Sequence, residues 1–487
     1  MKKIIIIGSG IGGSGIGALI AKNKDQKAKI ALFEQNKIIG GRCGSYIKKD
    51  DQGRDWKFDV GCHIISNCDK GPLGTILTKI GKDKDFQWSY TKNPGPRVNI
   101  MGMELKASGA ARRKKKKKKK IKKKSFIPQI KEMSDEEIET WNYISLKKLL
   151  DEKLGNKKVL QKIMYSMQAG VMFGTSPSDT SAGEYLKCTK LNAQTMSMGY
   201  PFGGCGAIPE TYCDCITENN GEIFLGKEGK VKKIIIEDNT VQGVEVGPDN
   251  EFYRADIVIA NSDIKTTVFK LIGEKYFDQE FLDWIKNLKW GGQVCSLKIG
   301  VDEKITDQKM LTYVPKMEGM DNIFTSIEDE LEDLDFTEMG VPEKSAQLIV
   351  PVSNHDPKLA PTGCQNIHTV TPTAFGKMVK WSKKDEEKWR ECCINSLVSL
   401  WPDLEDHIII SDFISTSHLE ARWGKEGAGT GIAQSIDQVA ERRPSQVSSI
   451  KGLYLSSGDA GGWGIGTELA AQSALELWDY FQNNNII

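Results

Sequence analysis

The chain has 487 residues, 39% of them hydrophobic and 27% charged, and its formal net charge is +2. This length predicts two or more interlocked domains, because a single hydrophobic core rarely grows so large. Twelve basic residues lie between Arg112 and Lys124, and without them 55 basic residues face 65 acidic ones, a net charge of −10. A protein built throughout for nucleic acid would carry the opposite charge, so nucleic acid is not an expected partner.

The N-terminal segment MKKIIIIGSGIGG predicts a buried first strand over Ile4–Ile7. Lysines before an apolar run resemble a secretory signal, but glycines end this run early and no cleavage site follows. No segment reaches the roughly 18 uninterrupted apolar residues that a membrane-spanning helix needs. The eleven cysteines are scattered and include no CxxC pair. They indicate reduced thiols, a cytoplasmic location and no metal site.

Three glycines, Gly8, Gly10 and Gly13, follow this strand and precede an apolar helical pattern. In such a unit the first glycine permits a tight turn, the second lets the backbone approach a pyrophosphate, and the third lets helix and strand pack closely. The helix N-terminus presents N–H groups and a positive dipole end to the phosphates. A second strand, AKIALFEQ, ends in Glu34, where an acidic side chain binds a ribose 2′-hydroxyl. The pattern predicts FAD or NAD rather than NADP.

Helices are predicted over about 130–195, with Ser134 as an N-cap and Gly155 as a stop. Residues 229–261 are typical of a β-meander whose last strand, DIVIAN, joins a parallel sheet. Strand candidates over 293–415 predict an antiparallel sheet backed by helices. The last apolar strand, Leu453–Leu455, precedes a glycine loop and a final helix.

Together these elements predict an α/β fold. A discontinuous Rossmann-like FAD-binding domain is combined with an α+β substrate or cap domain that contains an antiparallel sheet. We expect the cofactor domain to comprise 1–100, 200–265 and 450–487, and the substrate domain 101–199 and 266–449.

A mobile basic loop is expected at 108–126, because long runs of like charge repel one another and do not fold alone. The alternative is that Arg112–Lys124 contacts an anionic membrane surface, where each basic residue contributes on the order of 1 kcal/mol. The protein would then lie peripherally at the inner face of the membrane. No aromatic side chain interrupts the run, which argues against single-stranded nucleic acid.

The sequence resembles the FAD-dependent oxidoreductases of the phytoene desaturase and carotenoid–retinoid saturase type, in the superfamily that also holds amine oxidases. The resemblance covers nearly the whole chain and rests on Gly8–Gly13 with Glu34, GGR at 40–42, FDVGCH at 58–63, YPFGGCGAIPE at 200–210, ADIVIANSD at 255–263, RRPSQVSSIKGLYLSSGDA at 442–460, and the closing glycine loop and helix. It implies hydride transfer between flavin N5 and a hydrophobic, isoprenoid substrate by a desaturase, saturase or isomerase. The C-terminal loop contains no cysteine, so the FAD is expected to be non-covalent. No second dinucleotide unit is present, which leaves the electron partner unknown.

The resemblance also implies cofactor contacts. Glu34 matches the adenosine-ribose carboxylate, Gly41 and Arg42 match the loop beside the pyrophosphate and flavin, and Val231 matches the residue whose backbone meets the adenine. Gly458 and Asp459 match the ribityl and phosphate contact, and Gly466 and Thr467 match backbone donors beside the flavin pyrimidine. The complete expected set is Gly8, Gly10, Ile11, Gly12, Gly13, Glu34, Gln35, Gly41, Arg42, Gly61, His63, Val231, Gly458, Asp459, Gly466 and Thr467.

The sequence identifies no catalytic residue, because hydride transfer needs an oriented substrate and a dry site rather than a strong base. His63 and Trp463 are candidates, since their segments are expected near the flavin; a structural histidine that bonds the backbone and a packing tryptophan are the alternatives. Glu468 is expected to serve the dipole of the last helix, and Tyr200 either lines the cavity or packs.

Two other functions fit parts of the pattern. One is a flavin amine oxidase. The other is a non-enzymatic prenyl-binding protein similar to guanine-nucleotide dissociation inhibitors, which lose much of the flavin fingerprint. The retained Gly8, Glu34, Arg42 and Asp459 favour an enzyme. Gly461-Gly462-Trp463 replaces the HPG-type segment of carotene desaturases, so the resemblance does not assign carotene itself as the substrate.

Overall fold

A five-stranded parallel sheet brings together distant parts of the chain, in the strand order β19-β13-β1-β2-β9. Its strands are β1 (Lys2–Ile7), β2 (Ala28–Glu34), β9 (Glu222–Leu225), β13 (Ile257–Ala260) and β19 (Leu453–Leu455). The computed structural model describes residues 1–23, 28–61, 63–106, 126–155, 159–316, 340–374 and 378–487. The predicted first strand is therefore central in this sheet, and DIVIAN joins it as expected.

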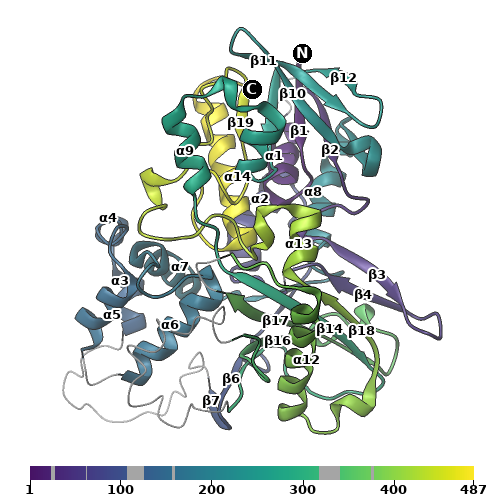
Figure 1. Cartoon of the computed structure of the whole chain (residues 1–487), viewed down its shortest axis with the longest axis vertical. Coiled ribbons are helices and arrows are strands. Elements are labelled where there is room, and N and C mark those ends of the chain that lie inside the picture. Colours follow the sequence, from purple (N-terminus) through teal and green to yellow (C-terminus); the bar gives the residue numbers. More distant parts are fainter. Residues whose placement is uncertain (24–27, 62, 107–125, 156–158, 317–339, 375–377) are drawn as a thin grey trace.

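Alternate residues of β1 face opposite layers, as the two-residue period of a strand requires. Ile4 and Ile6 pack with α1 (Ile11–Lys22), α2 (Pro72–Ile80), α8 (Ala207–Glu218) and α14 (Gly466–Asn483). Ile5 and Ile7 pack against an antiparallel sheet of β10 (Val231–Glu237), β11 (Thr240–Val246) and β12 (Glu251–Arg254). This is a Rossmann-like sandwich, with the meander in the predicted place (Figure 1).

A second sheet has seven strands, in the order β18-β14-β17-β16-β15-β6-β7. Its strands are β6 (Arg97–Ile100), β7 (Met103–Lys106), β14 (Gln293–Val301), β15 (Leu311–Val314), β16 (Gln347–Pro351), β17 (Gln365–Ala374) and β18 (Ile408–Ile414). All pairs are antiparallel except β15 with β6. The α12 helix (Lys383–Leu400) backs the sheet through Trp389 and Leu397. The expected antiparallel sheet is confirmed.

Five helices form a separate cluster at one side of the molecule (Figure 1). They are α3 (Phe126–Glu132), α4 (Asp135–Glu139), α5 (Leu146–Leu154), α6 (Val159–Phe173) and α7 (Ala182–Thr195). Ser134 caps α4 by accepting from the N–H of Glu137 at 3.1 Å, and Gly155 follows the end of α5, as predicted. Phe126, the last residue of the expected basic loop, instead begins α3 and is buried.

Shorter elements join these parts. They are the hairpin β3 (Ser45–Lys49)–β4 (Asp55–Asp59), the pair β5 (Trp88–Tyr90)–β8 (Gly199–Pro201), α9 (Gln279–Asn287) and α13 (Thr416–Trp423). Trp56 of the hairpin packs on Gly300, where an added Cβ would lie 2.4 Å from the indole. The hairpin therefore rests on the seven-stranded sheet and leads back to the dinucleotide-binding part.

The division at 1–100, 200–265 and 450–487 remains our proposal for the cofactor domain. β6, at the end of its first segment, pairs within the seven-stranded sheet rather than the parallel one. The basic run Arg112–Lys124 lies outside the described residues. Across the described ranges, no helix is both long and apolar enough to cross a membrane. The ten described cysteines are free thiols.

Candidate functional site

The turn between β1 and α1 is so tight that it requires glycine. Gly8 has a φ of +97°, in the left-handed region. A Cβ on Gly12 would lie 2.3 Å from the carbonyl oxygen of Ser456, and one on Gly13 would lie 2.2 Å from that of Gly8. The first four N–H groups of a helix have no partner within it and lie at the positive end of its dipole. The turn and the start of α1 at Ile11 therefore fit the pyrophosphate of a dinucleotide.

Two side chains from neighbouring strand ends hold this loop. The amide of Asn261, after β13, accepts from the N–H of Gly10 at 3.1 Å and donates to the carbonyl of Ser456 at 2.8 Å. The hydroxyl of Ser456, after β19, donates to the carbonyl of Gly12 at 3.0 Å. Sequence reasoning assigned neither residue a role. The signal that could have found them is their position directly after buried strands of the same parallel sheet, where ligands bind.

Glu34 lies at the end of β2 and is 5% exposed. One carboxylate oxygen accepts from the N–H and hydroxyl of Ser9, each at 2.9 Å. The other oxygen accepts from the N–H and side-chain amide of Asn36, at 2.8 and 2.9 Å. Four donors therefore orient the carboxylate beside the Gly8–Gly13 turn, where a ribose hydroxyl would join or replace one of them.

The loop Gly40–Arg42 lies against the same turn. Gly40 and Gly41 have φ values of +102° and +57°, and the N–H of Gly40 donates to the hydroxyl of Ser9 at 3.1 Å. The guanidinium of Arg42 donates to the carbonyls of Ala428, Gly429 and Thr430 at 3.2, 3.1 and 2.6 Å. Arg42 thereby holds the 428–430 segment over this edge of the parallel sheet.

Asp459, which was expected to contact the ribityl or phosphate groups, is fully buried and forms an ion pair with Lys425. Its carboxylate also accepts from the N–H groups of Ile264 and Ile432, both at 3.3 Å. Burial alone would raise the pKa of Asp459, but Lys425 and the guanidinium of Arg42 outweigh it and lower that pKa. Lys425 has a φ of +59° and carries no sequence motif, so its role became visible only in the fold.

The remaining expected contacts surround this centre. The N–H of Gly61 donates to the carbonyl of Arg42 at 3.1 Å, and Gln35 donates to that of Arg422 at 3.1 Å. Val231 begins β10 and packs in the same cluster as Phe33. Gly458 lies beside Gly431. A Cβ added to Gly431 would lie 2.4 Å from the carbonyl oxygen of Gly458.

The start of α14 lies farther along the same loop. Gly466 opens the helix with a φ of +48°, and Thr467 follows it. Glu468, buried in the first turn, accepts from the N–H of Asn67 at 3.0 Å. Trp463 packs against the helical cluster, and the ammonium group of Lys187 lies 4.6 Å from its ring centre. The contacts of Trp463 are therefore with the helical cluster.

A groove of about 670 Å³ adjoins Trp463. It lies between α4, α7, the 440–447 segment and α14. Its lining carboxylates are Asp135, Glu139, Glu184, Glu441 and Glu476, which outnumber the basic Lys187 and Arg443.

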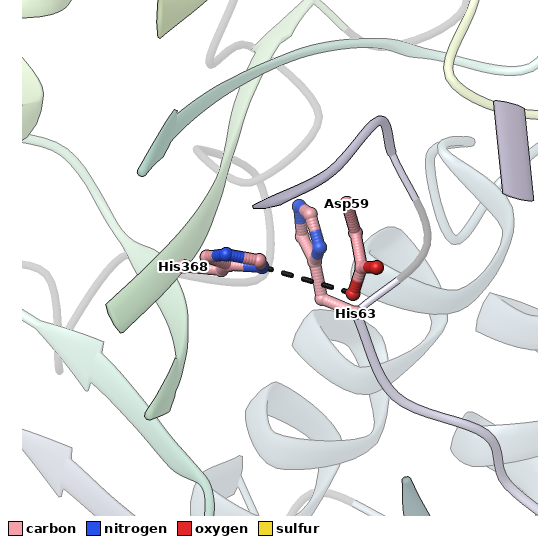
Figure 2. A group of neighbouring side chains, drawn as sticks. All are labelled: Asp59, His63 and His368. Carbon is pink, nitrogen blue, oxygen red and sulfur yellow. Dashed lines mark ion pairs between the residues drawn. The ribbon is translucent and has the colours of Figure 1, made fainter. Parts of the chain in front are cut away.

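His63 belongs to a second polar centre, on the seven-stranded sheet. Asp59, His63 and His368 turn their side chains toward one another, and His368 Nδ1 lies 3.8 Å from the Asp59 carboxylate (Figure 2). The ammonium group of Lys298, the β14 partner of His368, donates to the carbonyl of Val60 at 3.1 Å. Burial lowers the pKa of Lys298 to about 7, although Asp412 and Asp59 act in the opposite direction.

Tyr200 also contributes to this second centre. It is fully buried, and its hydroxyl donates to the Asp59 carboxylate. Of the two expected roles, the structure therefore shows Tyr200 as a packed side chain with a hydrogen bond.

The fold thus joins the Gly8–Gly13 turn, Glu34, Gly41, Arg42, Gly61, Gly458 and Asp459 at the carboxyl edge of the parallel sheet. The glycine cradle and the anchored carboxylate fit a dinucleotide. The side chain of His63 lies beside Asp59 and His368.

The sequence of this chain is similar to those of several known proteins. A family model described as an NAD(P)-binding Rossmann-like domain matches residues 6–79. Prolycopene isomerase of Daucus carota is 23% identical over 92% of this chain and 75% of its own length. Carotenoid 3,4-desaturase of Haloarcula japonica is 22% identical over 93% of each chain.

Solved structures match over nearly the whole length. An oxidoreductase from Methanosarcina mazei has a TM-score of 0.66 at 16% identity, with 98% of this chain and 100% of that one covered. Cyclohexylamine oxidase from Brevibacterium oxydans has a TM-score of 0.61 at 13% identity, with both chains fully covered. At these identities the structures establish the shared fold.

Proposed function

Because the chain belongs to the carotenoid desaturase-like superfamily of oxidoreductases, we propose that it is an FAD-dependent enzyme that transfers hydride between flavin N5 and a hydrophobic isoprenoid substrate. The observation that carries this proposal is the glycine turn with its anchored Glu34. A carboxylate held by four donors beside a phosphate cradle is suited to a ribose 2′-hydroxyl.

The proposed FAD would be held without a covalent bond. The start of α1 would bind the pyrophosphate, Glu34 the adenosine ribose, and the chain near Val231 the adenine. Arg42, Gly458 and Asp459 would flank the ribityl chain and the flavin, with Gly466 and Thr467 beside the pyrimidine. Bound FAD accepts or donates a hydride at N5, and the protein's part is to orient the substrate and exclude water.

The buried charges of Asp459 and Arg42 are compensated by protein groups rather than by water. Asp459 is compensated by Lys425, and Arg42 by three backbone carbonyls, so neither charge needs water for its partners. A dry environment favours hydride transfer and limits side reactions.

The test of the substrate class uses the purified protein with FAD under anaerobic conditions. We expect an isoprenoid polyene or its saturated counterpart to change the flavin redox state, seen as loss or return of the visible absorbance band of oxidised flavin. Extraction of lipid that copurifies with the protein identifies which isoprenoid to use. Flavin that responds to no isoprenoid in either redox direction would contradict the proposal.

The rival enzyme is a flavin amine oxidase, which the carboxylate-rich groove beside Trp463 favours. That enzyme would release hydrogen peroxide when given polyamines. Peroxide production at enzymatic rates from a polyamine, without any response to isoprenoids, would replace our assignment. A prenyl-binding protein without redox chemistry would instead remain colourless and refuse FAD.

The basic run Arg112–Lys124 suggests how such an enzyme would reach a lipid-soluble substrate. We propose that it binds anionic membrane surfaces and carries an otherwise acidic protein to the bilayer. Co-sedimentation with anionic vesicles is expected, weakened by salt and by deletion of 112–124. Equal sedimentation of the deletion variant would exclude this role.

A further inference from the structure

Asp59, His63 and His368 come from three separate segments and meet in the interior. Asp59 ends β4, His63 lies in the segment that follows, and His368 lies in the middle of β17. Their exposed fractions are 1%, 3% and 0%, and one ligand atom from each lies within 4.8 Å of the other two. Figure 2 shows the three side chains converging on one point.

Donors surround the Asp59 carboxylate and hold its orientation. It accepts from the hydroxyl of Ser45 at 2.6 Å, from the N–H of Cys205 at 3.0 Å and from the hydroxyl of Tyr200. A carboxylate that accepts several hydrogen bonds holds its charge even when buried. Outer partners of this kind orient metal ligands in proteins.

The tautomer of His63 follows from its neighbour. His63 Nε2 lies 2.8 Å from the hydroxyl oxygen of Ser296, and that hydroxyl gives its only proton to the carbonyl of Thr369 at 2.6 Å. Ser296 must therefore accept from His63, which places the proton of the neutral ring on Nε2. His63 Nδ1 then presents a lone pair, the form that a metal ion requires.

His368 is the unexplained member of the cluster. It is fully buried, and neither ring nitrogen forms a hydrogen bond with the described residues. Such a pair of buried nitrogens is costly unless something binds them.

We propose that Asp59, His63 and His368 bind a divalent transition-metal ion such as Zn²⁺. Two imidazoles and one carboxylate form a ligand set that suits such ions, and the nearly complete burial points to a structural role that ties β4 to β17. With metal–ligand bonds of about 2.0–2.2 Å, the three ligand atoms must draw together by roughly 1 Å from their present spacing. This inference is independent of the proposed redox function.

Lys298 brings a basic group close enough to Asp59 to interact with it electrostatically, and this group would oppose a bound cation. Its β14 position is paired with His368, and Asp59 is one of the two carboxylates that favour its charged form. Removal of this charge as Lys298→Met is expected to tighten metal binding. Unchanged or weaker binding by a folded Lys298→Met variant would count against the assigned position.

The experiment measures Zn²⁺ bound to the full-length protein by equilibrium dialysis and elemental analysis. Wild type is expected to bind one more high-affinity Zn²⁺ than His368→Gln or Asp59→Asn, with an affinity loss of about 100-fold in each variant. His355→Gln is the buried control, because His355 bonds Ser89 and Lys309 instead. His407→Gln is the surface control, because His407 faces Asp302 and Glu303 and offers an adventitious site.

Equal Zn²⁺ stoichiometry and affinity in wild type and His368→Gln would overturn the proposal. X-ray absorption of the Zn²⁺-loaded wild type gives a second test that requires no variant. The expected shell contains nitrogen and oxygen with two imidazoles, whereas a shell dominated by sulfur, from the free thiols, would overturn it as well.

Discussion

The Gly8–Gly13 turn and the Asp59–His368 cluster are two polar regions of the molecule that are built in opposite ways. The turn uses contiguous residues and mainly backbone groups, so one short segment carries most of its geometry. The cluster uses side chains from β4, the following segment, β14 and β17, which meet only in the folded chain. A local motif is therefore readable from sequence, whereas a centre assembled across sheets is not.

The turn can be broken with a single methyl group. Gly12→Ala would place a Cβ 2.3 Å from the carbonyl of Ser456, and neither backbone can move without opening the sheet edge. We expect loss of FAD binding and a destabilisation of several kcal/mol, of the order seen for strong overpacking. Gly95→Ala is the matched control, because Gly95 lies outside the expected cofactor contacts and the nearest neighbour of an added Cβ lies at 3.9 Å. Cofactor content and thermal unfolding measure both; equal behaviour of the two variants would refute the account of the turn.

The Lys425–Asp459 pair, on the side of the parallel sheet, tests how much the buried charges contribute. Lys425→Met leaves Asp459 buried without its closest counter-charge, and we expect a loss of about 3–5 kcal/mol in the free energy of unfolding. Lys289→Met removes an exposed pair with Asp437 and should cost at most about 1 kcal/mol. Denaturant titration compares them, and similar losses would mean that Asp459 is compensated by other groups.

The stability of the part of the molecule that contains the seven-stranded sheet should depend on pH through buried histidines. Burial lowers the pKa of His355 to about 4, below the usual 6.5. Between these values the unfolded chain binds a proton that the folded chain does not, so stability is lost as the pH falls from about 6.5 to 4, by at most about 3 kcal/mol. His355→Gln should flatten this part of the stability–pH curve.

The surface histidine His407 provides a control of opposite sign. Asp302 raises its pKa, so its contribution to stability is present at low pH and is lost as the pH rises through the folded pKa. His407→Gln should therefore produce a small change in the other direction. A His355→Gln curve that follows the wild type between about pH 4 and 6.5 would contradict the buried, neutral state of His355.

The smallest expected effect concerns the ribose carboxylate. Glu34→Gln keeps the size of the side chain but places an amide NH₂ against N–H and hydroxyl donors. We expect FAD affinity to fall roughly 10–100-fold, corresponding to about 1.5–3 kcal/mol for a charged hydrogen bond. Glu218→Gln is the matched control, since Glu218 is an exposed carboxylate that pairs with Lys82 outside the site. Equal affinities would remove Glu34 from the site.

Much of the fold followed from local patterns. The Ile4–Ile7 strand, the meander before Asn261, the cap at Ser134 and the strands of the antiparallel sheet all lie where alternation and capping residues indicated. These signals are local, because hydrophobic period and turn chemistry act over a few residues. The position of β6 between β7 and β15 depends on a distant partner, β15, and no local pattern contains it.

The candidate site divides along the same line. Gly8, Gly13 and Glu34 could be named from spacing, since their geometry is set by one β–α–β unit. Lys425 and His368 could not, because their significance depends on Asp459 and Asp59, which approach them only through tertiary packing. Lone charged or histidine residues in a sequence carry no such information.

The most direct test of the central claim is the flavin content of the purified full-length protein. We expect a yellow protein that releases one FAD per chain on denaturation, with the FAD restored after removal and nearly absent from Gly12→Ala. A folded wild-type protein that is colourless and takes up no added FAD would contradict the assignment of this chain as an FAD-dependent oxidoreductase.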